Sequence, residues 1–440
     1  MAGKGVRTVQ DPGRLRDLAR GIAAGSLSPV DLVERYLARI AEVEGTVEAW
    51  RHVDAEGARA AARERAAEAK AGRLRGPLHG IPVGVKDIID VEGIPTRCNS
   101  RSRAGVPAAT ADAEIVLQLR NLGAVILGKT HTTEFAFFDP SPARNPHNPK
   151  HTPGGSSSGS ASALAAGTAP LTLGTQTVAS VNRPASYCGI SAFKPSTRSM
   201  TMTGVAPLAP SYDTMGFYGW TVDDAVYAYE AVMPGFVACP AKPVPTALTI
   251  VLPEDPHLGD VTADMKAAWT ATADALAKAG HTIERRPSPI SFARLFEIQR
   301  TTMLYEAGRA MRSFLELPAG QIGEKLTGAI KDGLAVTLAQ YIDLRSEIDA
   351  MRRTFFDWGR SADAFLWPAA PGTAPEGLAW TGDPKFISPW TALGGPLVSI
   401  PAGLASNGLP VGCILASAPG TDVAMCAIAR RVAEIAERHT

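Results

Sequence analysis

The first part of the chain has the periodicity of α-helices. Ser28 followed by Pro29 is typical of a helix start, because serine caps free N–H groups and proline fits the first turn. The stretch 55–72 is rich in alanine, glutamate and arginine, which favour helices. The pattern predicts helices over residues 12–72. Apolar residues recur in it three and four positions apart, at Leu32, Val33, Tyr36, Leu37 and Ile40.

The pattern then changes to short apolar runs at 81–85, 124–127 and 169–173. Helical or glycine-rich segments separate these runs. Short runs that alternate with helices are typical of strands in an α/β protein with a largely parallel or mixed sheet. Residues 222–360 return to mostly helical patterns, broken by a strand-like run at 247–252.

The last part of the chain again has short apolar runs, with many glycines and prolines, over 363–415. Residues 420–437 have the pattern of a closing amphipathic helix. No tandem repeat or linker divides the sequence. We therefore expect a single large α/β domain over 1–440, with a mixed β-sheet core flanked by helices. Its expected parts are a helical N-terminal region (about 10–75), a central core with the candidate chemistry (about 76–220), and a helical insertion with the C-terminal part of the sheet (about 221–440).

Composition narrows the class of protein. The 440 residues are 45% hydrophobic, and 44 lysines and arginines face 43 acidic residues. Because the charges nearly cancel, we expect neither a nucleic-acid nor a membrane partner. No run of about 18 apolar residues and no apolar N-terminal signal is present, so we expect neither a membrane span nor a secretion signal. The cysteines are far apart, without metal-ligand or disulfide spacing, and are expected to be reduced, mostly buried thiols of a cytoplasmic protein: Cys98, Cys188, Cys239, Cys413 and Cys426.

The most unusual segment is Thr-Pro-Gly-Gly-Ser-Ser-Ser-Gly-Ser at 152–160. Composition alone is also compatible with a flexible linker. However, the segment runs directly into small residues at 161–167 that can pack as a helix, and the apolar run 169–173 follows. A glycine-rich turn that opens a helix presents free N–H groups and hydroxyls. Such a turn suits a site that handles developing negative charge.

Two further residues are candidates for chemistry. Ser180 follows the strand-like run 169–173 within Gly-Thr-Gln-Thr-Val-Ala-Ser, where an ordinary turn serine is the alternative. Lys86 lies in the apolar run Gly-Ile-Pro-Val-Gly-Val-Lys, where the alternative is a side chain that extends to water. If Lys86 is buried, its pKa falls and its neutral amine can act as a general base.

Together these segments resemble the amidase signature family. The resemblance rests on GGSSSGS, a GTxTxxS element and Cys188-Gly-Ile-Ser-Ala-Phe-Lys-Pro, and on Ser180 following Ser156 by 24 residues, as in the family. Lys86 matches the family lysine in its GIPVxVKD context. Further similarity lies at 145–149, 211–216, 394–403 and 408–412, so the resemblance covers roughly residues 10–437.

The resemblance implies a serine hydrolase that cleaves C–N bonds of amides without a metal or cofactor. Lys86 and Ser156 would relay protons, and Ser180 would form the acyl-enzyme. It also implies a cis peptide bond at Gly155–Ser156. None of the eight histidines lies in a context that indicates a Ser-His-Asp triad. The oxyanion would be held by the backbone N–H groups of Thr177, Val178, Ala179 and Ser180.

The chain departs from the family pattern beside the nucleophile. Gln176 stands where the family has aspartate, and Val178-Ala179 replace two glycines. Either the backbone angles there suit L-residues, or the loop is strained. Asn182 replaces an arginine that binds a substrate carboxylate in some members, with Arg183 next, so we expect no malonamate-like substrate. A smaller departure is Ser158, which replaces the glycine after the two serines.

The substrate pocket is expected at about 131–140 and 380–395, where aromatic residues gather. We predict that Phe135, Phe137, Phe138 and Trp390 bind substrate; the segments also hold Trp380 and Phe386, and core packing is the alternative for these rings. The GTQT form resembles aryl acylamidases and bacterial urethanases, which implies a small-molecule aryl amide or urethane (carbamate) substrate. The alternatives are an amidotransferase subunit of a larger complex and a catalytically weak binding subunit. If the protein associates with itself, we expect a homodimer.

Overall fold

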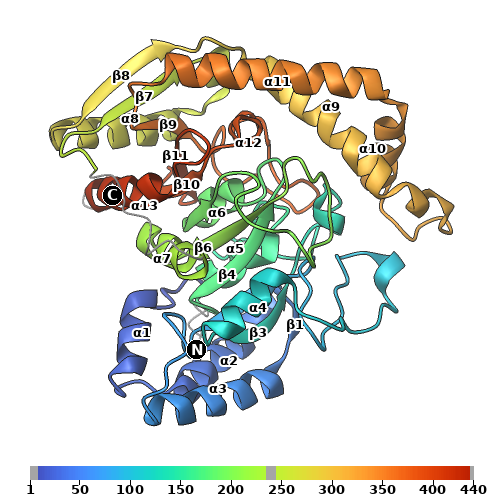
Figure 1. Ribbon diagram of the computed structural model, residues 1–440, viewed down its shortest axis with the longest axis vertical. Coiled ribbons are helices and arrows are strands. Elements are labelled where there is room, and N and C mark those ends of the chain that lie inside the picture. Colours follow the sequence, from blue (N-terminus) through green and yellow to red (C-terminus); the bar gives the residue numbers. More distant parts are fainter. Residues whose placement is uncertain (1–7, 234–243, 437–440) are drawn as a thin grey trace, which may run out of the picture.

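The computed structural model describes residues 8–233 and 244–436, which form one mixed sheet flanked by helices (Figure 1). The eleven strands of these residues follow the order β1-β3-β2-β4-β6-β5-β10-β11-β9-β7-β8. This arrangement confirms the expected single α/β domain. The strands are β1 (Trp50–Val53), β2 (Pro82–Lys86), β3 (Val125–Thr130), β4 (Leu171–Gln176), β5 (Ser191–Lys194), β6 (Thr214–Gly219), β7 (Thr249–Glu254), β8 (Thr282–Pro287), β9 (Ala364–Pro368), β10 (Leu397–Leu404) and β11 (Pro410–Ala416).

Helices cover the sheet along its whole length. In Figure 1, α1, α2 and α3 lie at one end of the molecule, while α9, α10 and α11 lie at the other. The α-helices are α1 (Leu15–Ala23), α2 (Pro29–Val47), α3 (Ala55–Lys70), α4 (Glu114–Asn121), α5 (Ser158–Ala165), α6 (Asn182–Cys188), α7 (Val222–Val232), α8 (Ala263–Lys278), α9 (Phe292–Ala310), α10 (Glu324–Ala335), α11 (Leu338–Trp358), α12 (Ser388–Leu393) and α13 (Asp422–Ala436). Short 3-10 turns lie at Arg101–Arg103, Glu134–Ala136, Pro256–Asp260 and Arg312–Glu316.

The N-terminal helices are α1, α2 and α3, and Ser28 caps α2 by accepting a hydrogen bond from the Val30 N–H. The prediction of helices throughout 12–72 is wrong at β1, which lies between α2 and α3. This short strand pairs antiparallel with β3 at the edge of the sheet. Pairing with a distant strand decides its conformation, which a four-residue pattern does not reveal.

The three apolar runs predicted as strands in the central region are β2, β3 and β4. Strand β2 pairs in parallel with both β3 and β4. The carboxyl ends of parallel strands meet at one edge of a sheet. Lys86 and Gln176, the last residues of β2 and β4, therefore lie at the same edge.

In the C-terminal half, β7 and α13 confirm the predicted strand and closing helix. Strand β8 lies in a region predicted as helical. Its sequence, Thr-Ile-Glu-Arg-Arg-Pro, is mostly polar because it is an edge strand that pairs only with β7 and has no fully buried residue. It therefore lacks the apolar signal of the other strands.

The described cysteines are Cys98, Cys188, Cys413 and Cys426, and all four are buried free thiols, as predicted. Cys239 lies outside the described residues. Among the helices that the structure describes, none combines the length and apolar character needed to cross a membrane.

Candidate active site

Lys86 lies at the centre of the candidate site. Its side chain is fully buried at the end of β2. Its Nζ lies 2.8 Å from Ser156 Oγ and 2.9 Å from Thr175 Oγ1 on the neighbouring strand β4. The sheet therefore brings the lysine and the serine together, although 70 residues separate them in sequence.

The environment of Lys86 favours the neutral amine. Burial lowers its pKa from 10.5 to about 7, and nearby Asp213 and Cys98 counteract part of this effect. Asp213 is itself buried, which raises the pKa of its carboxyl group. A large share of Lys86 is thus unprotonated at neutral pH. An amine in this state can accept a proton from the Ser156 hydroxyl.

The serine- and glycine-rich segment is a fixed loop that leads into α5. The bond Gly155–Ser156 is cis, as expected. The Ser156 carbonyl accepts a hydrogen bond from the Thr133 N–H (3.1 Å), and the Gly155 carbonyl accepts one from Arg183 Nη2 (2.7 Å). Residues 152–165 are buried throughout. The alternative of a flexible linker is therefore wrong for this segment.

Ser180 lies in the turn between β4 and α6. It is 7% exposed, and its hydroxyl makes no hydrogen bond to any described residue. In the same part of the structure, the backbone N–H groups of residues 177–180 have no protein acceptor. Neither Val178 nor Ala179 has a positive φ. Of the two alternatives, backbone angles that suit L-residues hold, so four N–H groups are free to meet a negative oxygen without left-handed strain.

Gln176 supports this turn in a way that aspartate cannot. Its Oε1 accepts hydrogen bonds from the N–H groups of Val181 and Asn182, which start α6. Its Nε2 donates to Thr391 Oγ1 (2.9 Å), and Thr391 in turn donates to the Val178 carbonyl (2.6 Å). An ionised carboxylate has no proton for the bond to Thr391. The amide therefore links the start of α6 to the turn before Ser180.

The two residues after the turn are both engaged with the protein. Asn182 Nδ2 donates to Ser399 Oγ at 3.0 Å. Arg183 is 2% exposed, and it donates to the carbonyls of Gly155 and Gly382 and to Thr381 Oγ1. Arg183 therefore fixes the loop that carries Ser156, and it is not among the residues that line the neighbouring cavity.

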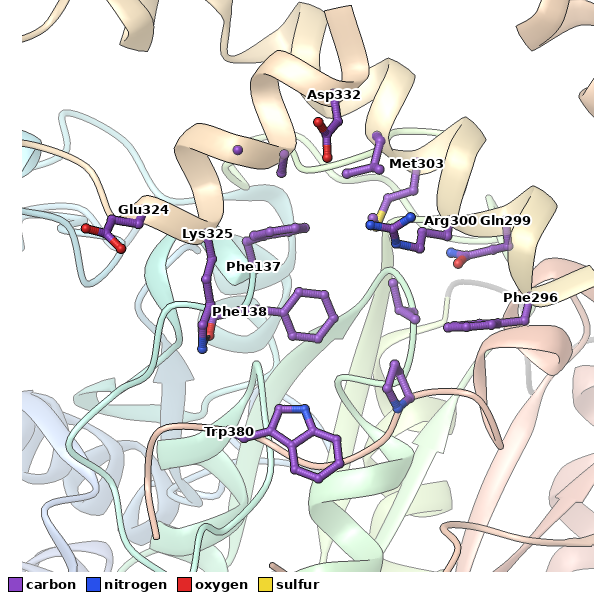
Figure 2. Close-up of a pocket in the computed structure, with 15 residues that line it drawn as sticks. Phe137, Phe138, Phe296, Gln299, Arg300, Met303, Glu324, Lys325, Asp332 and Trp380 are labelled. Carbon is purple, nitrogen blue, oxygen red and sulfur yellow. Dashed lines mark hydrogen bonds between the residues drawn. The ribbon is translucent and has the colours of Figure 1, made fainter. Parts of the chain in front are cut away.

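A cavity of about 460 Å³ opens beside the turn, within the roughly 300–1,000 Å³ usual for small-molecule sites (Figure 2). Val178 forms part of its wall, and α9 and α10 carry another part. Figure 2 shows the rings of Phe138 and Trp380 facing the cavity below these helices. The lining residues are mainly aromatic and apolar, with charges among them: Phe137, Phe138, Val178, Phe296, Gln299, Arg300, Met303, Leu304, Glu324, Lys325, Gly328, Ala329, Asp332, Trp380 and Pro384.

The predicted pocket residues fall into two groups. Phe137 and Phe138 line the cavity, as does Trp380. Trp390 does not: it is 1% exposed and packs against the rings of Phe292, Phe355, Phe365 and Trp367, so its assignment as a substrate residue is corrected to core.

Phe135 and Phe386 also lie away from this cavity. Phe135 packs against Phe314, with ring centroids 4.8 Å apart, and borders a different hollow. Phe386 is fully buried and contacts Trp367. Aromatic rings near a site serve either the core or the cavity, and composition does not separate the two roles.

Sequence reasoning did not identify Gln299 and Thr391 as supports of the site. Gln299 Nε2 donates to the Thr177 carbonyl (2.9 Å), and its Oε1 accepts from Ser388 Oγ (2.9 Å). Both contacts join segments more than eighty residues apart. The only local signal is a glutamine placed among apolar residues of α9, which is too weak to assign a role.

Comparison with known proteins finds similarity along most of the chain. The model of the Amidase family matches residues 31–426. A glutamyl-tRNA(Gln) amidotransferase subunit of Anaeromyxobacter sp. strain K is 31% identical, with 94% of each chain covered. The corresponding amidotransferase subunit of Rhodopirellula baltica is 38% identical over 49% of this chain and 44% of its own length.

A solved structure is similar over nearly the whole chain. The native peptide amidase from Stenotrophomonas maltophilia is 27% identical and superposes with a TM-score of 0.80 over 97% of this chain and 96% of that one. Family match and structural likeness thus extend well beyond the serine-rich motif. The chain belongs to the Amidase family.

Proposed function

We propose that this protein is an amidase that cleaves C–N bonds through an acyl-enzyme on Ser180. The contact that carries the proposal is the one between Lys86 Nζ and Ser156 Oγ, 2.8 Å in a fully buried position. Burial without an ion-paired carboxylate disfavours the charged ammonium form, and the partners of this amine include the hydroxyls of Ser156 and Thr175. A base that must be neutral at pH 7 gains a suitable pKa from such burial.

The geometry supports a proton relay in a defined order. The amine of Lys86 takes the proton of Ser156, and Ser156 takes that of Ser180 as Ser180 Oγ attacks the carbonyl carbon. The free N–H groups of residues 177–180 hold the oxygen that becomes negative. Ser156 then donates its proton to the leaving nitrogen, and the C–N bond breaks. Water releases the acyl group by the same relay.

For the substrate we propose an apolar aryl amide or carbamate. The support is the cavity, whose walls include Phe137, Phe138, Phe296 and Trp380. Flat apolar groups fit between such rings. Arg183 makes hydrogen bonds only within the protein, so it gives no support to a substrate with a carboxylate beside the scissile bond.

A second candidate function is that of an amidotransferase subunit with protein partners. The observation that favours it is the relative from Anaeromyxobacter, an amidotransferase subunit matched over 94% of each chain. A catalytically weak binding subunit is a separate alternative. Co-purification of the untagged protein from its host, followed by size measurement, would separate partner complexes from a monomer or homodimer.

The test is a panel of anilides, primary amides, carbamates and glutamine, assayed with the parent and Ser180→Ala. We expect hydrolysis of anilides or carbamates by the parent and none by the variant, with an unchanged circular dichroism spectrum. A fluorophosphonate should label Ser180, as located by peptide mass spectrometry. Full activity in Ser180→Ala would refute the proposal, and turnover of glutamine alone would favour the amidotransferase role.

A further inference from the structure

Helix α10 has two faces with different contacts. Ile330 and Gly333 are buried on the face toward α9, and Leu326 and Ala329 are buried as well. The helices approach closely there, because a Cβ at Gly333 would lie 1.8 Å from the Leu304 carbonyl oxygen, and one at Gly308 would lie 2.9 Å from that of Ile330. These two glycines are therefore needed for helix packing.

The other face of α10 borders the cavity. It presents Lys325, Gly328, Ala329 and Asp332, which are spaced as neighbours on one side of a helix. A Cβ at Gly328 would meet no atom within 4 Å. Glycine is unfavourable inside a helix, and no close approach requires it at this position. What its missing side chain provides is space in the cavity.

The wall opposite this surface is held in place. Lys325 Nζ donates to the carbonyls of Ala379 (2.8 Å) and Phe138 (3.3 Å). These bonds tie together the two segments that carry the Phe138 and Trp380 rings. Its ammonium group is thereby engaged with the backbone. The recess between the rings and α10 is thus bounded by anchored elements.

Charges in the cavity cancel. The four ionisable side chains among its lining residues are two cations and two anions: Arg300, Lys325, Glu324 and Asp332. Figure 2 shows Arg300 and Asp332 on the helices above the cavity, and Lys325 and Glu324 at its side. A balanced set of charges does not select a ligand of either sign. The recess therefore suits an uncharged group.

We propose that the Gly328–Ala329 surface seats the far, uncharged apolar end of the substrate, so that the enzyme accepts elongated amides. The inference rests on the proposed function, because it assumes that the carbonyl under attack lies at Val178 and the turn before Ser180. Val178 is the residue of this turn that lines the cavity, whereas Gly328 lines it from α10. Gly328 then sets the length of substrate that fits.

The test fills the space at Gly328 with Gly328→Leu. Gly45→Leu is the matched control, because Gly45 also lies inside a helix, its added Cβ meets no atom within 4 Å, and it is remote from the cavity. Dissociation constants are measured by calorimetry in the Ser180→Ala background, so that no turnover is required. The probes are 4-nitroanilides with acetyl or decanoyl groups, and benzamides of short or long alkyl amines.

We expect Gly328→Leu to raise the dissociation constant of a long probe at least about tenfold more than that of the short probe in the same series. This is the scale of discrimination that pocket size provides. Gly45→Leu should change neither dissociation constant. Equal effects on long and short probes in both series would overturn the inference. Turnover of all the probes by the parent is measured separately. If the long probes bind in a way that depends on Gly328 but the parent hydrolyses no probe, the proposed function is refuted, whereas the binding site for the apolar end is not.

Discussion

Replacing Lys86 with methionine should change the free energy of unfolding in a pH-dependent way, and the change should be most favourable at neutral pH. The folded protein holds Lys86 with a pKa of about 7, whereas the unfolded chain exposes it with the ordinary value of 10.5. Between these values the unfolded state binds more protons than the folded state, so stability rises with pH over this window. Methionine has no such proton, is close in length, and suits a buried position.

The pH dependence can be worked out from these two values. A pKa difference from 10.5 to about 7 makes folding of the parent less favourable by about 4 kcal/mol at pH 7, and by about 1 kcal/mol at pH 10. The variant also leaves the hydroxyls of Ser156 and Thr175 without their amine partner, which costs about 1–3 kcal/mol each at both pH values. The effect of methionine on the free energy of unfolding should therefore become about 3 kcal/mol less favourable between pH 7 and pH 10.

Urea denaturation of parent and variant at pH 7 and pH 10 measures this change directly, because constant losses cancel in the comparison. Lys70→Met is the control: Lys70 is exposed at the end of α3, and its replacement should have the same effect at both pH values. A Lys86→Met effect that is equally independent of pH would refute the assignment of a neutral buried amine. Activity should be lost in Lys86→Met whatever its stability.

Three further outcomes are expected. For an uncharged amide, kcat/KM should rise as pH increases through about 7 and then level off, because the amine of Lys86 must be unprotonated to act as the base. The same rise in Lys86→Ala would argue against Lys86 as the base. Thr391→Val should lower kcat and reduce the free energy of unfolding by about 1–3 kcal/mol, because Gln176 Nε2 and the Val178 carbonyl lose their hydrogen-bond partner. Thr391→Ser keeps the hydroxyl and should preserve kcat and stability. Equal activity in the parent and both variants would argue against a role of Thr391 in supporting the turn. Val178→Gly should raise kcat/KM for bulky amides relative to small ones, whereas Ala179→Gly should not, because Val178 lines the cavity and Ala179 does not. Each substitution should reduce the free energy of unfolding by about 0.4–1 kcal/mol. The same change in kcat/KM for both variants would exclude cavity shaping by Val178.

The sequence was most informative where several residues act at fixed spacing. Lys86, Ser156 and Ser180 belong to motifs whose joint order is specific, and the structure places the first two within 2.8 Å. The apolar strands were predictable because burial on both faces requires continuous apolar runs. The edge strands β1 and β8 were missed, because β1 has only four residues and β8 is mostly polar, so neither has the apolar signal of the inner strands.

Side-chain roles around the site were harder to predict. Trp390 and Trp380 lie in the same predicted segment, but one is 1% exposed in the core and the other 52% exposed at the cavity. The difference depends on the orientation of the short helix α12, which carries Trp390, relative to the preceding loop, which carries Trp380. Gln299 reaches the site from α9, 122 residues after its partner Thr177. No pattern in either segment encodes that meeting.

The two helices above the cavity differ in how freely evolution can alter them. Gln299 ties α9 to the Thr177 carbonyl, so a substitution that shifts α9 also displaces the catalytic turn. Within the described residues, no hydrogen bond joins α10 to residues 176–183. Gene duplicates of this enzyme can therefore acquire new substrate preferences through α10 while the reacting groups stay unchanged. A library for laboratory selection is best concentrated on the positions of that helix that line the cavity, Gly328 and Asp332 among them.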